Sequence, residues 1–300
     1  MDTDKSGELS REEFEALNDI MGFGQKKKLS MMMCLMFLLF FSGALAGVTS
    51  GLFGVGGGFI VVPALLYVFS IFGYSSEETI FVAVGTSLAT IIIASARAAL
   101  THHKLASVNI MFLKDWGPWI LFGSSVGVAA ATTISGSSLA VIFASGVGIY
   151  SMYFLFPSAL DKFTLRDLPK GVVRACLGSS IGGFSVLLGI GGGTPIVITM
   201  TLCRRPIVEA VGTAACVGAI IGLVGTLDFV LLGINQVSVA APPWSLGFIN
   251  LPALLAIAAC STITAPIGAR LAHRVDPLHL KRMFGFYLLT VSSAMFSQSF

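Results

Sequence analysis

The chain has 300 residues, of which 55% are hydrophobic and 11% charged, whereas soluble domains carry about 25% charged residues. Four long stretches contain no charged side chain: 29–76, 116–160, 175–203 and 229–269. Because a membrane-spanning helix needs roughly 20 apolar residues, this composition excludes an ordinary soluble protein and predicts an integral, multi-pass membrane protein. The net charge of +3 gives no basis for a nucleic-acid partner.

The first 28 residues differ from the rest, since they hold seven of the fifteen acidic residues and predict a soluble appendage. Residues 2–13 follow the EF-hand pattern, in which oxygen ligands recur at fixed positions around a glycine turn. The predicted calcium ligands are Asp2, Asp4, Ser6, Glu8, Ser10 and Glu13. No entering helix precedes this loop in the sequence, so two readings stay open: weak Ca²⁺ binding, or an inert remnant.

From Leu29 onward the sequence predicts ten apolar segments. They are 29–53, 59–72, 80–100, 117–135, 138–156, 171–188, 194–203, 207–232, 248–268 and 283–299. The second and the seventh are too short to span a membrane as straight helices, so we predict half-helices, which membranes tolerate where they are buried in protein or line a cavity. The predicted fold is all-α: a polytopic bundle of about eight to ten segments.

An internal repeat divides the membrane part into two halves, residues 29–160 and 161–300. The glycine cluster at 54–58 recurs at 189–193, and Ala-Val-Gly-Thr recurs downstream of each cluster in the same order. Each half has five segments, an odd number, so the two halves are predicted to lie in opposite orientations as inverted repeats.

Loop charges agree with that inversion, because basic residues favour the cytoplasmic side. The loops predicted on that side are 101–115, 157–170, 203–206 and 269–282. Lys26, Lys27 and Lys28 conflict with this arrangement, which would put both termini on the opposite side.

Each glycine cluster precedes a proline, Pro63 or Pro195, and predicts a helix, a break and a new helix. The free N–H groups and partial positive charge of a helix start form an anion site. Broken helices in both repeats mark the substrate site of many secondary transporters. Small residues spaced by four also allow close helix packing. This second reading is favoured for Gly43, Gly47, Gly178 and Gly182, and stands equal for the clusters themselves.

Several motifs together resemble the sulfite exporter TauE/SafE family over about residues 30–298. They are SGLFGVGGGFIVVPALL at 50–66, AVGTS at 83–87, HHK at 102–104, the second glycine cluster, APIGARLAHRV at 265–275 and KRMFGFY at 281–287. The resemblance implies a permease in the lipid bilayer for sulfite, sulfonates, thiosulfate or similar small anions, driven by an ion gradient. It implies no enzymatic activity and no required cofactor.

Carried over by position, the resemblance implies a set of substrate-binding residues: Gly54, Gly56, Gly57, Gly58, Thr86, Ser87, Gly189, Gly191, Gly192, Gly193 and Thr213. Two intramembrane charges are further candidates, because such groups are costly in a bilayer. Arg97 either attracts the anion or extends to the membrane surface. Asp228 either carries a coupling ion such as H⁺ or lies at the interface beyond a shorter helix.

Three other functions compete with a carrier. An anion channel would share all of these features. A membrane-embedded enzyme needs a buried cluster of reactive side chains, and only Asp228 and scattered cysteines are available. An assembly factor has no need of paired helix breaks.

Overall fold

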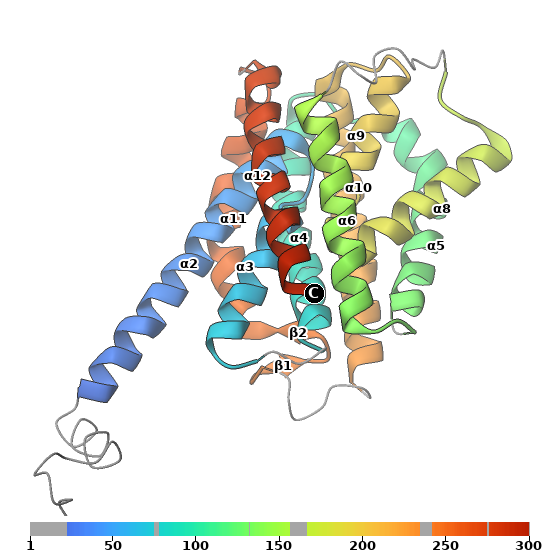
Figure 1. The fold of residues 1–300 in the computed structure, drawn as a ribbon. Coiled ribbons are helices and arrows are strands. Elements are labelled where there is room, and N and C mark those ends of the chain that lie inside the picture. The colour runs from blue at the N-terminus through green and yellow to red at the C-terminus, as the bar shows by residue number, and fades with distance from the viewer. Residues whose placement is uncertain are drawn as a thin grey trace, which may run out of the picture.

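The computed structural model describes residues 23–74, 78–131, 133–156, 167–234, 242–274 and 276–299, and the fold is an all-α bundle (Figure 1). Its helices are α2 (Phe23–Phe53), α3 (Gly58–Ile71), α4 (Glu78–Lys104), α5 (Ile110–Ala131), α6 (Gly136–Leu155), α8 (Gly171–Leu187), α9 (Gly193–Leu202), α10 (Ile207–Gly233), α11 (Leu251–Leu271) and α12 (Pro277–Ser299). A helix is found at each of the ten predicted apolar segments. The predicted calcium loop at 2–13 lies outside the described residues.

The helical surface is apolar over much of its area, as a lipid-facing surface must be. Large hydrophobic side chains such as Phe37, Phe122, Leu231 and Ile263 are more than half exposed. Among the described residues, five helices are long and apolar enough to cross a membrane: Met32–Phe53, Glu78–Lys104, Gly136–Leu155, Ile207–Gly233 and Leu251–Leu271. The chain is therefore an integral, multi-pass membrane protein, as predicted.

The two predicted half-helices are α3, with 14 residues, and α9, with 10. Both are too short to span a bilayer core of about 30 Å at 1.5 Å per residue. Each starts in the interior beside the other and runs outward, α3 toward one end of the bundle and α9 toward the opposite end (Figure 1). Opposite directions are expected for the equivalent helices of an inverted repeat.

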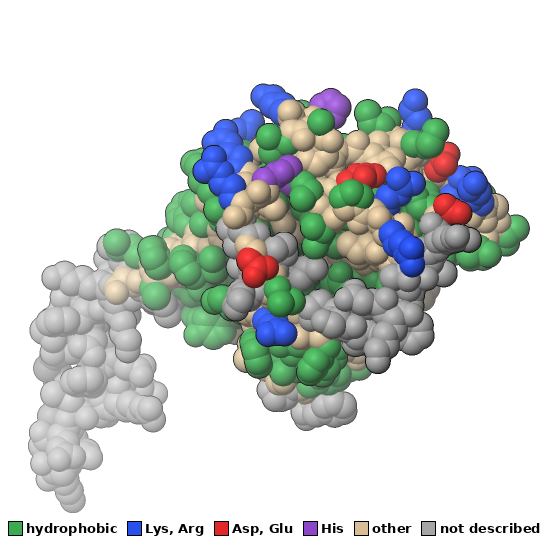
Figure 2. Space-filling view, turned by 90° about the horizontal axis from the view of Figure 1, so that it is seen from above, with side chains coloured by type: hydrophobic (Ala, Val, Ile, Leu, Met, Phe, Trp, Pro, Cys, Tyr) green, Lys and Arg blue, Asp and Glu red, His purple; other side chains and the backbone are tan. Residues whose placement is uncertain are grey.

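The helix directions bring the four predicted cytoplasmic loops to the same end of the molecule, where α4, α6, α9 and α11 finish (Figure 1). Figure 2 shows that end, with Lys and Arg side chains spread around its rim. We call it the basic end. Helix α2 starts at the opposite end, so the conflict raised by Lys26, Lys27 and Lys28 remains in the folded chain.

The repeats interlock instead of forming two separate bundles. Helix α2 of the first repeat packs on α11 of the second, and α8 of the second packs on α5 of the first. In the first pair, Gly43, Gly47 and Gly51 face Ile257, Ser261 and Ala265. In the second pair, a Cβ on Gly182 would overlap the Ile120 carbonyl oxygen, and one on Gly178 would meet Trp119. Close packing is therefore what these glycines provide.

The repeat symmetry also appears in two matching hydrogen-bond pairs. The Thr86 hydroxyl oxygen accepts a bond from the Asn250 N–H at 2.8 Å, and that of Thr213 accepts one from the Asn109 N–H at 2.9 Å. Each asparagine side chain also caps the helix that follows it, α11 or α5, by accepting a bond from the N–H three residues on. Both predicted site threonines thus join one repeat to the other.

A short antiparallel hairpin precedes α11. Strand β1 (Ser245–Leu246) pairs with β2 (Ile249–Asn250), and Ser245 lies opposite Asn250. The turn residue Gly247 has a φ of 55°, a conformation that glycine adopts without strain. The hairpin fixes the backbone of Asn250 against α4, at the end of the bundle opposite the basic end.

Close glycine packing makes a direct stability prediction. The Gly182→Ala variant should lose about 1–3 kcal/mol or more of unfolding free energy, because its methyl group would overlap the Ile120 backbone. The matched control is Gly117→Ala in the partner helix α5, where an added Cβ meets nothing within 4 Å. That control should be neutral or stabilising by up to about 1 kcal/mol. Thermal unfolding in detergent compares the two, and equal midpoints would contradict the packing argument.

Candidate anion-binding site

The two glycine clusters form sharp breaks between helices, α2 to α3 and α8 to α9. In each break three glycines have positive φ: Gly54 (68°), Gly56 (80°) and Gly57 (79°), and Gly189 (57°), Gly191 (65°) and Gly192 (73°). This left-handed backbone is costly for residues with a Cβ. It turns the chain so that α3 and α9 start in the protein interior, at Gly58 and Gly193.

The breaks contact each other through reciprocal glycines. A Cβ on Gly58 would overlap the carbonyl oxygen of Gly189, and a Cβ on Gly193 would overlap that of Gly54. The two contacts are related by the repeat, since Gly58 and Gly193 hold equivalent positions, as do Gly54 and Gly189. The starts of the two half-helices therefore meet in the core.

Side chains of α4 hold the breaks in place. Ile91 is fully buried and touches both, because a Cβ on either Gly56 or Gly191 would come within 3.1 Å of its side chain. The Ser87 hydroxyl donates a hydrogen bond of 2.8 Å to the Gly189 carbonyl oxygen. In the second repeat alanine, Ala214, occupies the position of Ser87, so this bond has no counterpart. The two half-sites are chemically different.

Four further hydroxyl groups near the breaks are fully buried, and none of them was among the residues predicted from the sequence: Ser50, Ser95, Ser185 and Thr194. Ser50 and Ser185 hold the same position in the repeat, four residues before Gly54 and Gly189, so aligning the repeats could have revealed both. The hydroxyl oxygens of Ser50 and Ser95 lie 3.4 Å apart.

The hydroxyls of Ser185 and Thr194 have no hydrogen-bond partner among the described residues. Ser185 Oγ lies 3.3 Å from the place where a Cβ of Gly192 would be, directly beside the residue that precedes α9. Thr194 is the second residue of α9 itself. A buried hydroxyl without a partner costs free energy, so both are available to a ligand at this helix start.

The start of α3 has a different environment. Phe59, the repeat equivalent of Thr194, is fully buried, and its ring centroid lies 5.7 Å from that of Tyr150. A Cβ on Gly57 would meet Ala46, whereas one on the equivalent Gly192 would meet Ile221 and Ser185. The α3 start has a phenylalanine where the α9 start has a threonine, and of the two starts only that of α9 has unpartnered hydroxyls beside it among the described residues. The α9 start is therefore the more polar anion site.

The structure does not bring the two predicted charged residues to the breaks. Arg97 is exposed on the outer face of α4, and its Nε lies 3.5 Å from the Thr262 carbonyl oxygen of α11. Asp228 lies ten residues beyond Gly218, the α10 residue that contacts Gly191, or about 15 Å along the helix. Its Oδ2 atom is buried without a hydrogen-bond partner in the described part of the chain.

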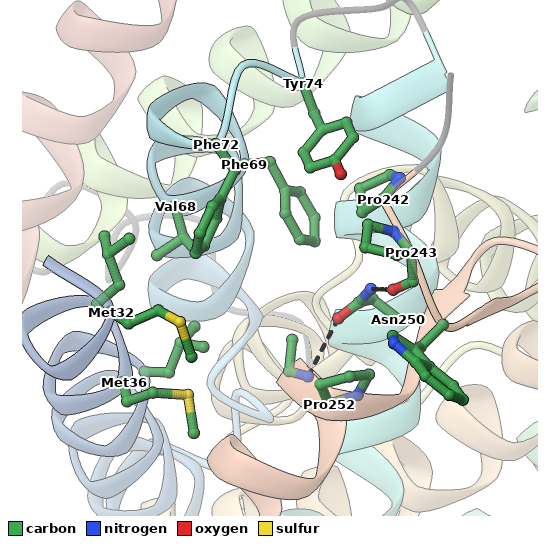
Figure 3. A pocket seen from close by; sticks show the side chains of 14 residues that line it. Met32, Met36, Val68, Phe69, Phe72, Tyr74, Pro242, Pro243, Asn250 and Pro252 are labelled. Carbon is green, nitrogen blue, oxygen red and sulfur yellow. Dashed lines mark hydrogen bonds between the residues drawn. The ribbon is translucent and has the colours of Figure 1, made fainter. Parts of the chain in front are cut away.

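An apolar cavity of about 320 Å³ lies away from the breaks, between α2, the end of α3 and the segment before α11 (Figure 3). Met32 and Met36 of α2 lie across it from Tyr74, Pro242 and Pro243. Asn250 contributes the polar edge, where its side-chain N–H donates to the Pro243 carbonyl at 3.0 Å. Without a charged lining residue, this cavity does not suit a small anion.

Comparison with known proteins agrees with this architecture. The sulfite exporter TauE/SafE family profile matches residues 39–295. A probable membrane transporter protein of Haemophilus influenzae is 33% identical over 259 residues, covering 85% of this chain and 95% of the relative. A probable membrane transporter protein of Methanocaldococcus jannaschii is 25% identical over 252 residues, covering 84% of this chain and 91% of that relative. No solved structure matches the chain. The chain is a membrane transporter and belongs to the sulfite exporter TauE/SafE family.

Proposed function

We propose that this protein is a secondary transporter for small sulfur-containing anions such as sulfite, thiosulfate or simple sulfonates, coupled to an ion gradient. The observation that carries the proposal is the buried α9 start with the unpartnered hydroxyls of Ser185 and Thr194 beside it. The family name supports the substrate class. The paired breaks support a carrier, because alternating access needs two related half-sites.

A compact oxyanion matches the donors at the α9 start. The first N–H groups of a helix have no acceptor within the helix, which leaves those of Gly193 and Thr194 for the ligand. Pro195 follows and has no N–H to contribute. Two hydroxyls add further donors, and the helix dipole adds a partial positive charge. None of these groups carries a negative charge, so the site favours anions over cations.

Binding requires the two breaks to separate, because Gly58 and Gly193 now bring their backbones into contact. On α4, Ile91 touches both breaks and Ser87 bonds the second one. Movement of α4 against the start of α9 opens room for the anion toward one end, and movement at α3 opens it toward the other.

Flux into proteoliposomes tests the function. Purified protein should transport sulfite or thiosulfate with saturation, accelerate exchange when unlabelled anion is present on the far side, and respond to an imposed pH gradient. Linear flux without accelerated exchange would indicate a channel instead. If folded protein moves none of sulfite, thiosulfate and a simple sulfonate, the sulfur-anion proposal is wrong. An enzyme or an assembly factor would also give no flux.

A further inference from the structure

A second cavity lies at the basic end between α4 and α11, with a volume of about 390 Å³. Its lining includes three cationic side chains, Arg97, Lys104 and Arg270, together with Leu100 and Pro266. No carboxylate lines it. Among the described residues, no ion pair is found for any of the three cations.

The three cations are arranged in depth. Arg97 and Lys104 are seven residues apart on one side of α4, which corresponds to two helical turns and about 10 Å along the axis. Lys104 ends α4 at the basic end, and Arg97 lies about 10 Å further back along the helix axis. The weak bond from Arg97 Nε to the Thr262 carbonyl directs the guanidinium toward α11 and leaves its terminal N–H groups free.

Exposed apolar side chains lie beside this cavity. Next to it on the same faces, Ile93 of α4 and Ile263 and Ile267 of α11 are exposed large hydrophobic side chains. Leu100, within the lining, is 56% exposed. An apolar surface thus continues from the cavity toward the membrane centre, where an acyl chain would lie.

We propose that this cavity binds the headgroup of an anionic phospholipid. The phosphate lies between Arg97, Lys104 and Arg270, and an acyl chain follows the exposed surface of Leu100, Ile263 and Ile267. Basic pockets between membrane helices on the cytoplasmic side recognise lipid phosphates in this way, and Arg provides bidentate hydrogen bonds to phosphate. The site joins α4 of one repeat to α11 of the other, and it is separate from the helix breaks.

Native mass spectrometry of the full chain in detergent tests the site by titration with phosphatidylglycerol and with phosphatidylcholine. Phosphatidylglycerol should be retained and phosphatidylcholine should not. The Arg97→Gln/Arg270→Gln variant should bind phosphatidylglycerol about 25-fold more weakly, or about fivefold for each basic side chain removed. The control with the same net charge is Lys114→Gln/Arg205→Gln, two exposed basic residues that do not line the cavity, and it should bind as the parent does.

Three results would overturn the proposal: equal retention of phosphatidylglycerol by the two double variants, equal retention of both lipids by the parent, or displacement of the lipid by inorganic phosphate or glycerol 3-phosphate at equal concentration. The last result would identify a soluble phosphate as the ligand. If the Arg97→Gln/Arg270→Gln variant does not fold, Lys104→Gln at the helix end should still show the fivefold loss. Anion flux is not read in this experiment, so its result is independent of the proposed transport function.

Discussion

Thr194→Val and Ser185→Ala variants are expected to transport the anion with kcat/KM lower by roughly tenfold or more, while unfolding at the same temperature as the parent or above it. A hydrogen bond to a charged ligand contributes about 1.5–3 kcal/mol, and each 1.4 kcal/mol is a factor of ten in rate. Neither hydroxyl has a partner in the described part of the protein. Removing either hydroxyl therefore breaks no hydrogen bond of the folded state, and it relieves the free-energy cost of burying an unpaired polar group.

The matched control is Thr199→Val on the same helix. The Thr199 hydroxyl donates to the Pro195 carbonyl oxygen at 2.7 Å within α9, so it is already satisfied. That variant should keep parental kinetics. Initial rates of thiosulfate uptake into proteoliposomes, together with thermal unfolding in detergent, give both quantities. Parental kinetics in Thr194→Val and Ser185→Ala would place the anion elsewhere, whereas a large fall in unfolding temperature would show that the hydroxyls are structural.

Local sequence signals were sufficient to predict the elements of this fold. Apolar segments predicted the ten helices, and a glycine run followed by Pro63 or Pro195 predicted each break, because both signals are local in the sequence. The inversion followed from counting segments. Even the separate packing role of Gly43 and Gly47 could be predicted, since spacing by four places both on one helix face.

The chemistry around the breaks depends on contacts between distant residues and could not be predicted as well. The family resemblance assigned Thr86 and Thr213 to the substrate site, and the structure adds that their hydroxyls accept hydrogen bonds from the backbone N–H groups of Asn250 and Asn109 in the other repeat. The interlocked packing of α2 on α11 creates those neighbours, and no local pattern records it. Ser185 was missed for a related reason. A serine in an apolar helix usually bonds its own backbone, and only tertiary packing leaves this hydroxyl unpaired.

The second large effect is expected for Asp228, the candidate residue for coupling transport to an ion gradient. This carboxylate lies in an apolar stretch of α10, and its Oδ2 is buried without a partner among the described residues. Ionisable side chains within membrane segments are costly, and they are candidates for carrying a coupling ion. If one proton moves with each anion, a gradient of one pH unit supports roughly tenfold accumulation. In Asp228→Asn, which has the same shape but cannot ionise, accumulation should fall to the level without a gradient.

Exchange of labelled for unlabelled anion needs no net proton movement, so Asp228→Asn should keep it near the parental rate. Loss of accumulation with exchange retained separates coupling from general damage to the carrier. The control is Asp115→Asn, since Asp115 is half exposed and paired with Arg174 at 3.2 Å at the basic end. It should accumulate anion as the parent does. A D228N protein that still concentrates anion along a pH gradient would show that another group carries the proton, or that a different ion drives transport.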